Sequence, residues 1–221
     1  MISKSNKIFL AGHNGMVGSA ILKKLKNLGY KNIICVSKKK LNLLDQKKVE
    51  SFLKKKKPKV VIIAAARVGG ILANNNNKAN FLYENLTIQT NIIHGSFLAG
   101  VKNLIFLGSS CIYPKKTKQP IKESFFMTGP LENTNDAYAI AKITGVKMCM
   151  EYSKQYKLNY KTLMPANMFG ANDNYDLSSS HFFPALIRKI HNAKIRKKKF
   201  ITLWGNGKPK RELLYVEDFA D

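Results

Sequence analysis

The sequence predicts a doubly wound α/β fold, in which a parallel sheet carries helices on both faces, followed by part of a smaller C-terminal lobe. Two observations predict it. Short apolar runs rich in Val and Ile alternate along the chain with longer helical stretches, which is the pattern of successive βαβ units. The first apolar run also leads directly into a glycine-rich loop that opens a helix, and parallel α/β domains often begin in this way.

Five runs of the chain are expected to be strands. Each is apolar at almost every position, which indicates burial on both faces of a sheet. In order they are Lys7 to Ala11, Asn32 to Val36, Lys59 to Ala65, Asn103 to Leu107 and Tyr160 to Met164. The stretches between them are long enough to cross over the sheet, and the expected helices are Met16 to Leu28, Gln46 to Lys55, Lys78 to Ala99 and Ala137 to Tyr156.

The pattern changes after Pro165. The elements expected beyond it are a polar loop from Ala171 to Ser180, a helix from Phe183 to Ala193, a short strand from Phe200 to Trp204 and the approach to a further helix from Leu214 to Asp221. The four consecutive asparagines Asn74 to Asn77 predict another loop. We therefore expect two parts, with residues 1–170 forming the sheet domain and residues 171–221 forming the start of a second lobe.

The formal net charge is +25, from 38 Lys and Arg against 13 Asp and Glu, and such a charge is the usual signature of a nucleic-acid-binding protein. The distribution of lysine argues against that function. Lysines occur in nearly every expected surface segment, and no lysine run has the interleaved aromatic side chains of a base-stacking surface. We interpret the excess as a compositional bias and expect no nucleic-acid partner, although the positive field attracts anionic nucleotides.

The three cysteines, Cys35, Cys111 and Cys149, do not predict a disulfide framework or a zinc site, because their number is odd and their spacing is unlike that of metal ligands. The apolar runs are far shorter than the roughly 18 to 20 residues that a membrane-spanning helix needs. We therefore expect no bound metal, no membrane partner and a cytoplasmic protein.

The loop after the first expected strand reads Gly12-His13-Asn14-Gly15-Met16-Val17-Gly18. Glycines at this spacing let the backbone turn sharply and approach a pyrophosphate, whose charge is stabilised by the helix N-terminus. Because the loop follows a strand and opens a helix, it predicts dinucleotide binding by the backbone from Gly12 to Gly18.

The end of the second expected strand predicts which dinucleotide is bound. An acidic residue usually stands there in NAD enzymes, where it accepts hydrogen bonds from the ribose 2′-hydroxyl. This chain has Ser37-Lys38-Lys39-Lys40 instead, and ammonium groups favour a 2′-phosphate. The sequence therefore favours NADP(H), with Lys38 and Lys39 as candidate ligands of that phosphate, unless these lysines belong only to the general excess.

Tyr138 and Lys142 stand four residues apart and therefore share one face of a helix. We expect the charge of Lys142 to lower the pKa of the phenol, so that Tyr138 acts as a general acid in ketone reduction. The preceding strand ends in Gly108-Ser109-Ser110-Cys111. Since ligands of open α/β sheets bind at the carboxyl ends of strands, we expect Ser109 to hydrogen-bond the same carbonyl oxygen.

Several stretches together resemble the extended short-chain dehydrogenase/reductases, and within them the GDP-L-fucose synthases. Besides the Gly12 loop, they are Ala64 to Ile71 (AAARVGGI), Leu107 to Pro114 (LGSSCIYP), Tyr138 to Lys142 (YAIAK) and Met164 to Asn167 (MPAN). They occur in the order and at the spacing of that family, and the resemblance covers essentially the whole chain. It implies an NADPH-dependent enzyme with a Rossmann domain that epimerises and then reduces GDP-4-keto-6-deoxy-D-mannose.

Two further residues carry catalytic roles by this resemblance. Such synthases invert C3 and C5 of the sugar before C4 is reduced, and the cysteine and histidine that exchange the protons correspond to Cys111 and His181. Thiols and imidazoles titrate near enough to neutrality for this work. Without the resemblance, Cys111 reads as a small buried side chain and His181 as the cap of a helix.

The glycine loop, the lysines after the second strand and the positions implied by the resemblance together give the candidate binding residues. For the cofactor they are Gly12, Asn14, Gly15, Met16, Val17, Gly18, Lys38, Lys39, Leu107, Gly108, Ser109, Ser110, Lys142, Pro165, Ala166, Asn167, Met168 and His181. For the substrate they are Lys189, Trp204 and Arg211. Many relatives carry arginine in place of Lys189, and some carry arginine against the 2′-phosphate in place of Asn14, a difference that weakens the preference for NADPH without reversing it. Lysine contacts a phosphate as a point charge where arginine forms two parallel bonds, and Trp204 could instead belong to the core.

Members of this family continue for about a hundred residues beyond a chain of this length, so the substrate lobe is expected to be truncated, and a homodimer through the two long helices is implied. Two alternatives remain. The chain could be another nucleotide-sugar enzyme, such as a 4-epimerase or 4,6-dehydratase, although Cys111 and His181 argue against these. It could also be a catalytically silent relative that binds nucleic acid through its charge.

Overall fold

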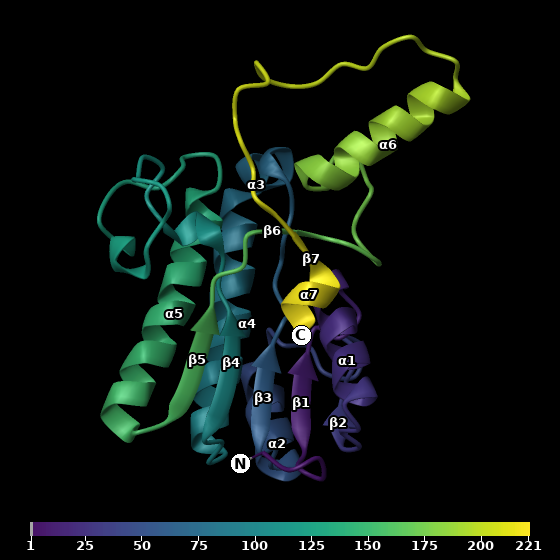
Figure 1. Cartoon of the computed structure of the whole chain (residues 1–221). Coiled ribbons are helices and arrows are strands. Elements are labelled where there is room, and N and C mark those ends of the chain that lie inside the picture. The colour runs from purple at the N-terminus through teal and green to yellow at the C-terminus, as the bar shows by residue number, and fades with distance from the viewer. Residues whose placement is uncertain (1) are drawn as a thin grey trace.

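The computed structural model describes residues 2–221 (Figure 1). In this part of the chain, five parallel strands form the main sheet in the order β2-β1-β3-β4-β5. Their bounds are β1 Ile8–Ala11, β2 Ile33–Ile34, β3 Val60–Ile63, β4 Asn103–Leu107 and β5 Asn159–Leu163. The predicted α/β class and the five predicted strands are confirmed, although β2 is shorter than expected.

Apart from Ile71–Asn76, which the sequence did not predict to be helical, the helices occupy the places that the sequence predicts. Their bounds are α1 Met16–Asn27, α2 Gln46–Lys56, α3 Ile71–Asn76, α4 Lys78–Leu98, α5 Asp136–Tyr156, α6 Phe182–Ile195 and α7 Val216–Ala220, with short 3-10 turns at Ser110–Ile112 and Glu123–Phe125. The expected helix near the end of the sequence is therefore present as α7. Residues Ala171 to Ser180 form no helix or strand, which agrees with the predicted polar loop.

The strands bury alternate side chains against helices on opposite faces. Phe9, Val61 and Phe106 belong to a core cluster that also contains side chains of α2, α4 and α5. Their neighbours in sequence, such as Leu10 and Ile62, pack instead against side chains of α1 on the other face. Because both faces are covered, β1 and β3 are apolar and buried throughout, as expected for a parallel sheet. The edge strand β5 instead exposes Asn159, Lys161 and Leu163.

Two sequence predictions are wrong. Asn74 to Asn77 do not form a loop, because Asn74 to Asn76 complete α3 and Asn77 joins α3 to α4. Phe200 to Trp204 do not form a strand, because among residues 2–221 no backbone hydrogen bond pairs them with another segment, and Phe200 is 84% exposed. Their apolar side chains gave a strand pattern that the surrounding chain does not support.

A second, small sheet that the sequence did not predict is formed by β6 (Asn167–Phe169), which pairs in parallel with β7 (Leu213–Tyr215). Each strand is too short for its pattern to be detected. This pairing joins segments on either side of the boundary expected at residue 170, and that boundary stays a prediction.

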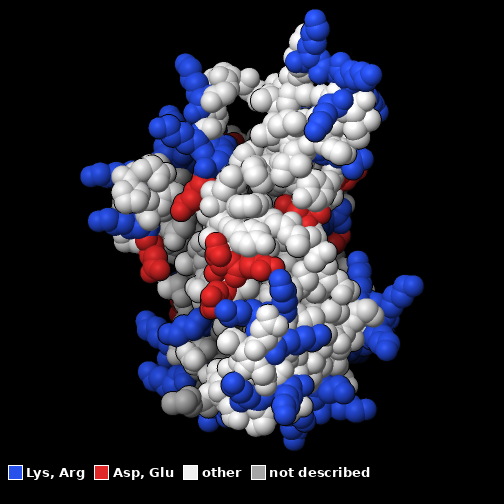
Figure 2. Space-filling model, turned by 45° about the vertical axis from the view of Figure 1, so that its right-hand side comes forward, with Lys and Arg blue, Asp and Glu red and all other residues white. Residues whose placement is uncertain are grey.

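All strands of the main sheet end at the same edge, which is uppermost in Figure 1, and α3, β6 and the start of α6 lie beyond this edge. Lysine and arginine are spread over the face shown in Figure 2, where acidic side chains gather near the middle. Among residues 2–221, no helix combines the length and the apolar character needed to cross a membrane.

Candidate active site

Glycines determine the shape of the loop after β1. Gly12 has a φ of +90°, which L side chains rarely adopt. A Cβ on Gly18 would lie 2.0 Å from the carbonyl oxygen of Gly12, far inside van der Waals contact. Gly15 is the N-cap of α1, and its N–H donates to that same Gly12 carbonyl at 3.1 Å. The loop therefore folds tightly onto α1, as a pyrophosphate site at a helix N-terminus requires.

A cavity of about 310 Å³ opens beside this loop. It is lined by residues 12–15, 36–38, 41–44 and 64–67, together with Glu84 and Ile88 of α4. The structure thus brings together the predicted residues Gly12, Asn14, Gly15 and Lys38. Lys39 is exposed in the adjoining turn and is not one of the lining residues, while Met16 to Gly18 form the first turn of α1.

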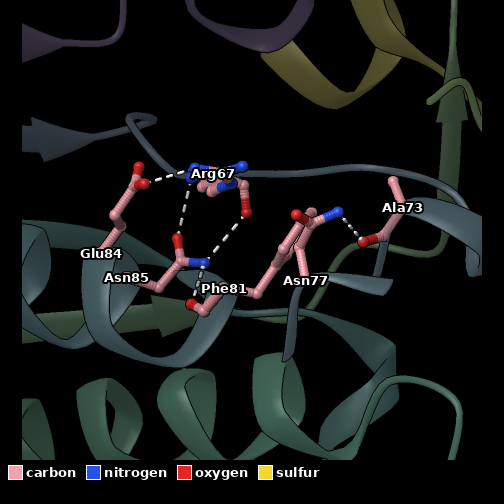
Figure 3. A network of polar contacts seen from close by, with 6 residues as sticks. All are labelled: Arg67, Ala73, Asn77, Phe81, Glu84 and Asn85. Carbon is pink, nitrogen blue, oxygen red and sulfur yellow. Dashed lines mark hydrogen bonds and ion pairs between the residues drawn. The ribbon is translucent and has the colours of Figure 1, made fainter. Parts of the chain in front are cut away.

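Arg67 lines the cavity, and no role was predicted for it from the sequence. Its guanidinium pairs with the carboxylate of Glu84 and lies 5.3 Å from the ring centroid of Phe81. The side chain of Asn85 accepts from the N–H of Arg67 at 2.9 Å and donates to its carbonyl at 2.9 Å (Figure 3). Arg67 follows β3 closely, so its place at the carboxyl edge of the sheet could have signalled a role at the site.

The carboxyl ends of β4 and β5 meet beyond the sheet. The N–H of Gly108 donates to the Leu163 carbonyl at 2.8 Å, and the N–H of Ser110 donates to the Pro165 carbonyl at 3.3 Å. Two of the predicted cofactor segments, Leu107 to Ser110 and Pro165 to Met168, are thus adjacent. The side-chain amide of Asn167 donates to the Glu212 carbonyl at 3.1 Å, so one of its functions is to hold β6 against β7.

Ser109, Cys111, Tyr138 and Lys142 form one cluster next to this edge. The backbone N–H of Cys111 donates to the hydroxyl of Ser109 at 3.4 Å. The Lys142 ammonium donates to the Leu107 carbonyl at 2.7 Å and lies 5.7 Å from the ring centroid of Tyr138. Ser109 and Cys111 both influence the pKa of the Tyr138 phenol, so they are its neighbours. Residues predicted from two separate segments are therefore in contact.

The expected effect of Lys142 on Tyr138 is wrong. Burial raises the pKa of Tyr138, the nearby Cys111 raises it further, and the hydrogen bond with Ser109 offsets only part of the rise. Burial also lowers the pKa of Lys142 to about 8, against an opposing effect of Cys111. The ammonium contacts the face of the phenol ring and the Leu107 carbonyl. Desolvation is thus the largest cause of the pKa shift of each group.

Cys111 lies in a short 3-10 turn directly after Ser109. Burial raises the pKa of its thiol, while the Ser109 hydroxyl and the charge of Lys142 lower it in part. The thiol is therefore protonated at neutral pH, and it is in electrostatic contact with Tyr138 and Lys142. This chemistry suits a group that delivers a proton to carbon and recovers one later.

His181 is the N-cap residue of α6 and has an exposed side chain. Desolvation by the surrounding protein atoms lowers the pKa of the imidazole, and the nearby carboxylate of Asp173 offsets part of this lowering. Its backbone adjoins Gly70, at the start of α3. Among residues 2–221, no hydrogen bond joins its side chain to the cluster around Cys111, so its catalytic role stays a prediction.

The predicted substrate residues lie on α6 and on the irregular chain that follows it. The Lys189 ammonium lies 5.3 Å from the ring centroid of Trp204 and donates to the Thr202 carbonyl at 3.0 Å. Trp204 is 71% exposed, which excludes the alternative that it belongs to the core. Arg211 is exposed and donates to the neighbouring Lys210 carbonyl. Lys189 and Trp204 are therefore together, whereas Arg211 has no described contact with them.

Comparisons with known proteins agree with this geometry. A model of the NAD dependent epimerase/dehydratase family matches residues 8–221. The chain is 52% identical to a putative GDP-L-fucose synthase 2 of Arabidopsis thaliana, covering 100% of this chain and 67% of the relative. It is 53% identical to a GDP-L-fucose synthase of Sinorhizobium fredii, covering 97% of this chain and 68% of the relative. A crystal structure of a GDP-L-fucose synthetase from Naegleria fowleri bound to NADP has a TM-score of 0.88 and 29% identity, with 100% of this chain and 72% of the other covered.

Proposed function

The chain belongs to the NAD dependent epimerase/dehydratase family, and we propose that it is the cofactor-binding and catalytic part of an enzyme that makes GDP-L-fucose. The substrate is GDP-4-keto-6-deoxy-D-mannose, which is inverted at C3 and C5 and then reduced at C4. The observation that carries this proposal is that Ser109, Cys111, Tyr138 and Lys142 lie near one another at one edge of the sheet. A simple ketone reductase has no need of a thiol in that cluster.

The residues beside β1 fit NADP(H). The close approach of Gly18 to Gly12 leaves no room for a Cβ, and the cavity next to them includes Asn14, Lys38 and Arg67. The backbone N–H groups at the start of α1 would hold the pyrophosphate, and the cations would hold the 2′-phosphate. When bound, the cofactor supplies the hydride for C4. The role of Arg67 in binding is part of this proposal.

The protein groups act on the sugar in two stages. The C4 ketone acidifies C3 and C5, so Cys111 and His181 can remove a proton from one face and return one to the other. Ser109 donates a hydrogen bond to the oxygen on which negative charge develops. Tyr138 then gives its proton to that oxygen when C4 is reduced. Its raised pKa keeps the phenol protonated at neutral pH, which a proton donor requires.

We also propose that Lys189, Trp204 and Arg211 bind the GDP-sugar. Lys189 and Trp204 combine a cation with an exposed ring face, which suits a phosphate beside a sugar or base. A homodimer through α4 and α5 is supported by apolar side chains that these helices expose, among them Tyr83, Ile140 and Met150. A cytoplasmic location is supported by the three free thiols.

The decisive experiment separates the two stages. In D₂O with NADPH and the keto-sugar, wild type is expected to give a product that carries deuterium at C3 and C5, as measured by NMR. Cys111→Ser is expected to lose this exchange and to retain NADPH affinity. Tyr138→Phe is expected to retain exchange and to slow NADPH oxidation by about 10² to 10⁴-fold. Unchanged exchange in Cys111→Ser would remove the epimerase assignment, and a reduced product with unchanged C3 and C5 would indicate a simple 4-reductase.

A further inference from the structure

The segment that leads into His181 is attached to the start of α3. The N–H of Gly70 donates to the Ser179 carbonyl at 2.8 Å. A Cβ on Gly70 would lie 2.1 Å from the carbonyl oxygen of Ser180 and 3.6 Å from Cα of His181. Gly70 has a φ of −68° and a ψ of −179°, which any residue can adopt. The reason for glycine at this position is therefore the closeness of the other segment.

Asn74 holds the turn on which this segment rests. Asn74 is buried, and only 6% of its surface is exposed. Its amide donates to the carbonyl of Gly69 at 2.6 Å and to the carbonyl of Gly70 at 3.1 Å. An amide that bridges two consecutive carbonyls fixes the direction of both peptide groups. The orientation of the Gly70 N–H toward Ser179 depends on this bridge.

The segment is also fixed on its other side. The carboxylate of Asp176 accepts from the N–H groups of Ser178 and Ser179, each at 3.0 Å, and the N–H of Ser180 donates to the Asp176 carbonyl at 2.8 Å. These bonds give the segment a single folded shape. The helix α6 begins at Phe182. His181 therefore lies between the Asp176 turn and the first turn of α6, next to Gly70.

We propose that Gly70 and Asn74 are positioning residues that set the place of His181 over the sugar. This inference rests on the proposed role of His181 in proton exchange. It assigns a function to two residues remote in sequence from the histidine, one of which lies in an asparagine run that otherwise looks like a simple tract. Proton transfer to and from carbon demands close alignment, and a displacement of about 1 Å at a reacting group can reduce a rate by roughly a hundredfold.

The test compares Gly70→Ala with wild type. The added methyl must displace Ser180 by about 1 Å to reach van der Waals contact, and His181 follows it in the chain. We expect the kcat of solvent-deuterium exchange at C3 and C5 to fall by roughly a hundredfold. The KM for the sugar and the affinity for NADPH should change little. Asn74→Ala, which loses only the bridge, should show a smaller fall in the same quantity.

Asn75 supplies a matched control, because it is the next asparagine of the same helix, is exposed, and forms no side-chain hydrogen bond among the described residues. Asn75→Ala should exchange at the wild-type rate. A second readout needs no substrate: the imidazole ¹H–¹⁵N resonances of His181 should shift in Gly70→Ala and in Asn74→Ala, and should not shift in Asn75→Ala. If Gly70→Ala does not fold, the Asn74 and Asn75 pair carries the comparison.

The outcomes separate this inference from the proposed function. If wild type exchanges and Gly70→Ala or Asn74→Ala exchanges at the same rate, the positioning role is overturned and the proposed function stands. If wild type itself incorporates no deuterium, the proposed function fails, and the His181 resonances alone decide the positioning role. Resonances that are identical in wild type and in both variants would overturn it.

Discussion

Lys142 is expected to reduce the stability of the fold at neutral pH, and its replacement by methionine tests this. The side chain is only 4% exposed. Burial lowers its pKa from 10.5 to about 8, so the native state binds this proton less tightly than the unfolded chain does. Methionine has nearly the same length and carries no charge. Lys142→Met should therefore remove the desolvation penalty and leave the packing close to unchanged.

The magnitude follows from the change in pKa. One pKa unit corresponds to about 1.4 kcal/mol, so the lowering from 10.5 to about 8 amounts to about 3 kcal/mol of lost stability below pH 8. Between pH 8 and 10.5 the unfolded chain binds the proton and the native state has released it, so this penalty disappears as the pH rises. The variant also loses the donor to the Leu107 carbonyl, which costs about 1 kcal/mol at every pH.

The assay is urea unfolding of both proteins between pH 6 and 10.5. At pH 7 the variant should be more stable than wild type by about 2 kcal/mol, and at pH 10.5 it should be less stable by about 1 kcal/mol. Taking the difference between the proteins removes the contribution of groups remote from Lys142, such as Cys149, while Cys111 responds to the lost charge of Lys142. Burial raises the pKa of Cys111 and raises that of Cys149 to about 12, so these thiols make both proteins less stable as the pH passes the pKa of the unfolded thiols.

A constant difference in stability across this range would refute the reasoning, because it would mean that Lys142 has the same pKa in the folded and unfolded states. A variant less stable than wild type at pH 7 would show that the bond to the Leu107 carbonyl outweighs desolvation. The expected result has a functional meaning as well. Lys142 would then destabilise the fold while lying next to Tyr138. Destabilising side chains are retained in proteins where activity requires them.

Two further substitutions test the binding regions. Gly18→Ala places a Cβ 2.0 Å from the Gly12 carbonyl oxygen. It should lower the free energy of unfolding by about 1–3 kcal/mol, measured by urea unfolding, and weaken NADPH binding, measured by NADPH fluorescence. Gly15→Ala, whose Cβ would meet its nearest neighbour at 3.6 Å, should lose less stability, and equal losses in the two variants would contradict the steric argument. Lys189→Arg should bind GDP roughly tenfold more tightly, as measured by calorimetry, because a guanidinium can form two parallel bonds to a phosphate. Lys194→Arg on the same helix is the control. Equal effects of the two changes on GDP affinity would argue against a phosphate contact at Lys189.

Local sequence pattern predicted most of the fold. β4 begins and ends at the predicted residues, and α2 and α4 differ from the predicted ranges by one residue. These elements have long, consistent patterns because both faces of the sheet are buried and each helix must cover it. Where the pattern was brief the prediction failed, as at Phe200 to Trp204, where apolar side chains stand in a segment without a partner.

The asparagine run shows the limit of composition as a guide. Asn74 to Asn77 are identical in type, so the sequence predicts one behaviour for all of them. In the structure Asn74 is buried and bridges two carbonyls, whereas Asn75 is exposed. Only the approach of residues 179–181 to Gly70 distinguishes the two positions, and these segments are more than a hundred residues apart in the chain.

By itself, the sequence determined the alternation of strands and helices, the glycine loop at the start of α1 and the placing of Tyr138 and Lys142 on one helix face, because each depends on residues close together in the chain. The tertiary structure decided the pKa directions of Tyr138 and Lys142, the place of Arg67 in the cavity and the attachment of the His181 segment to α3. Those properties depend on desolvation and on contacts between distant segments. Neither is encoded in local spacing, so both appear only when the chain is folded.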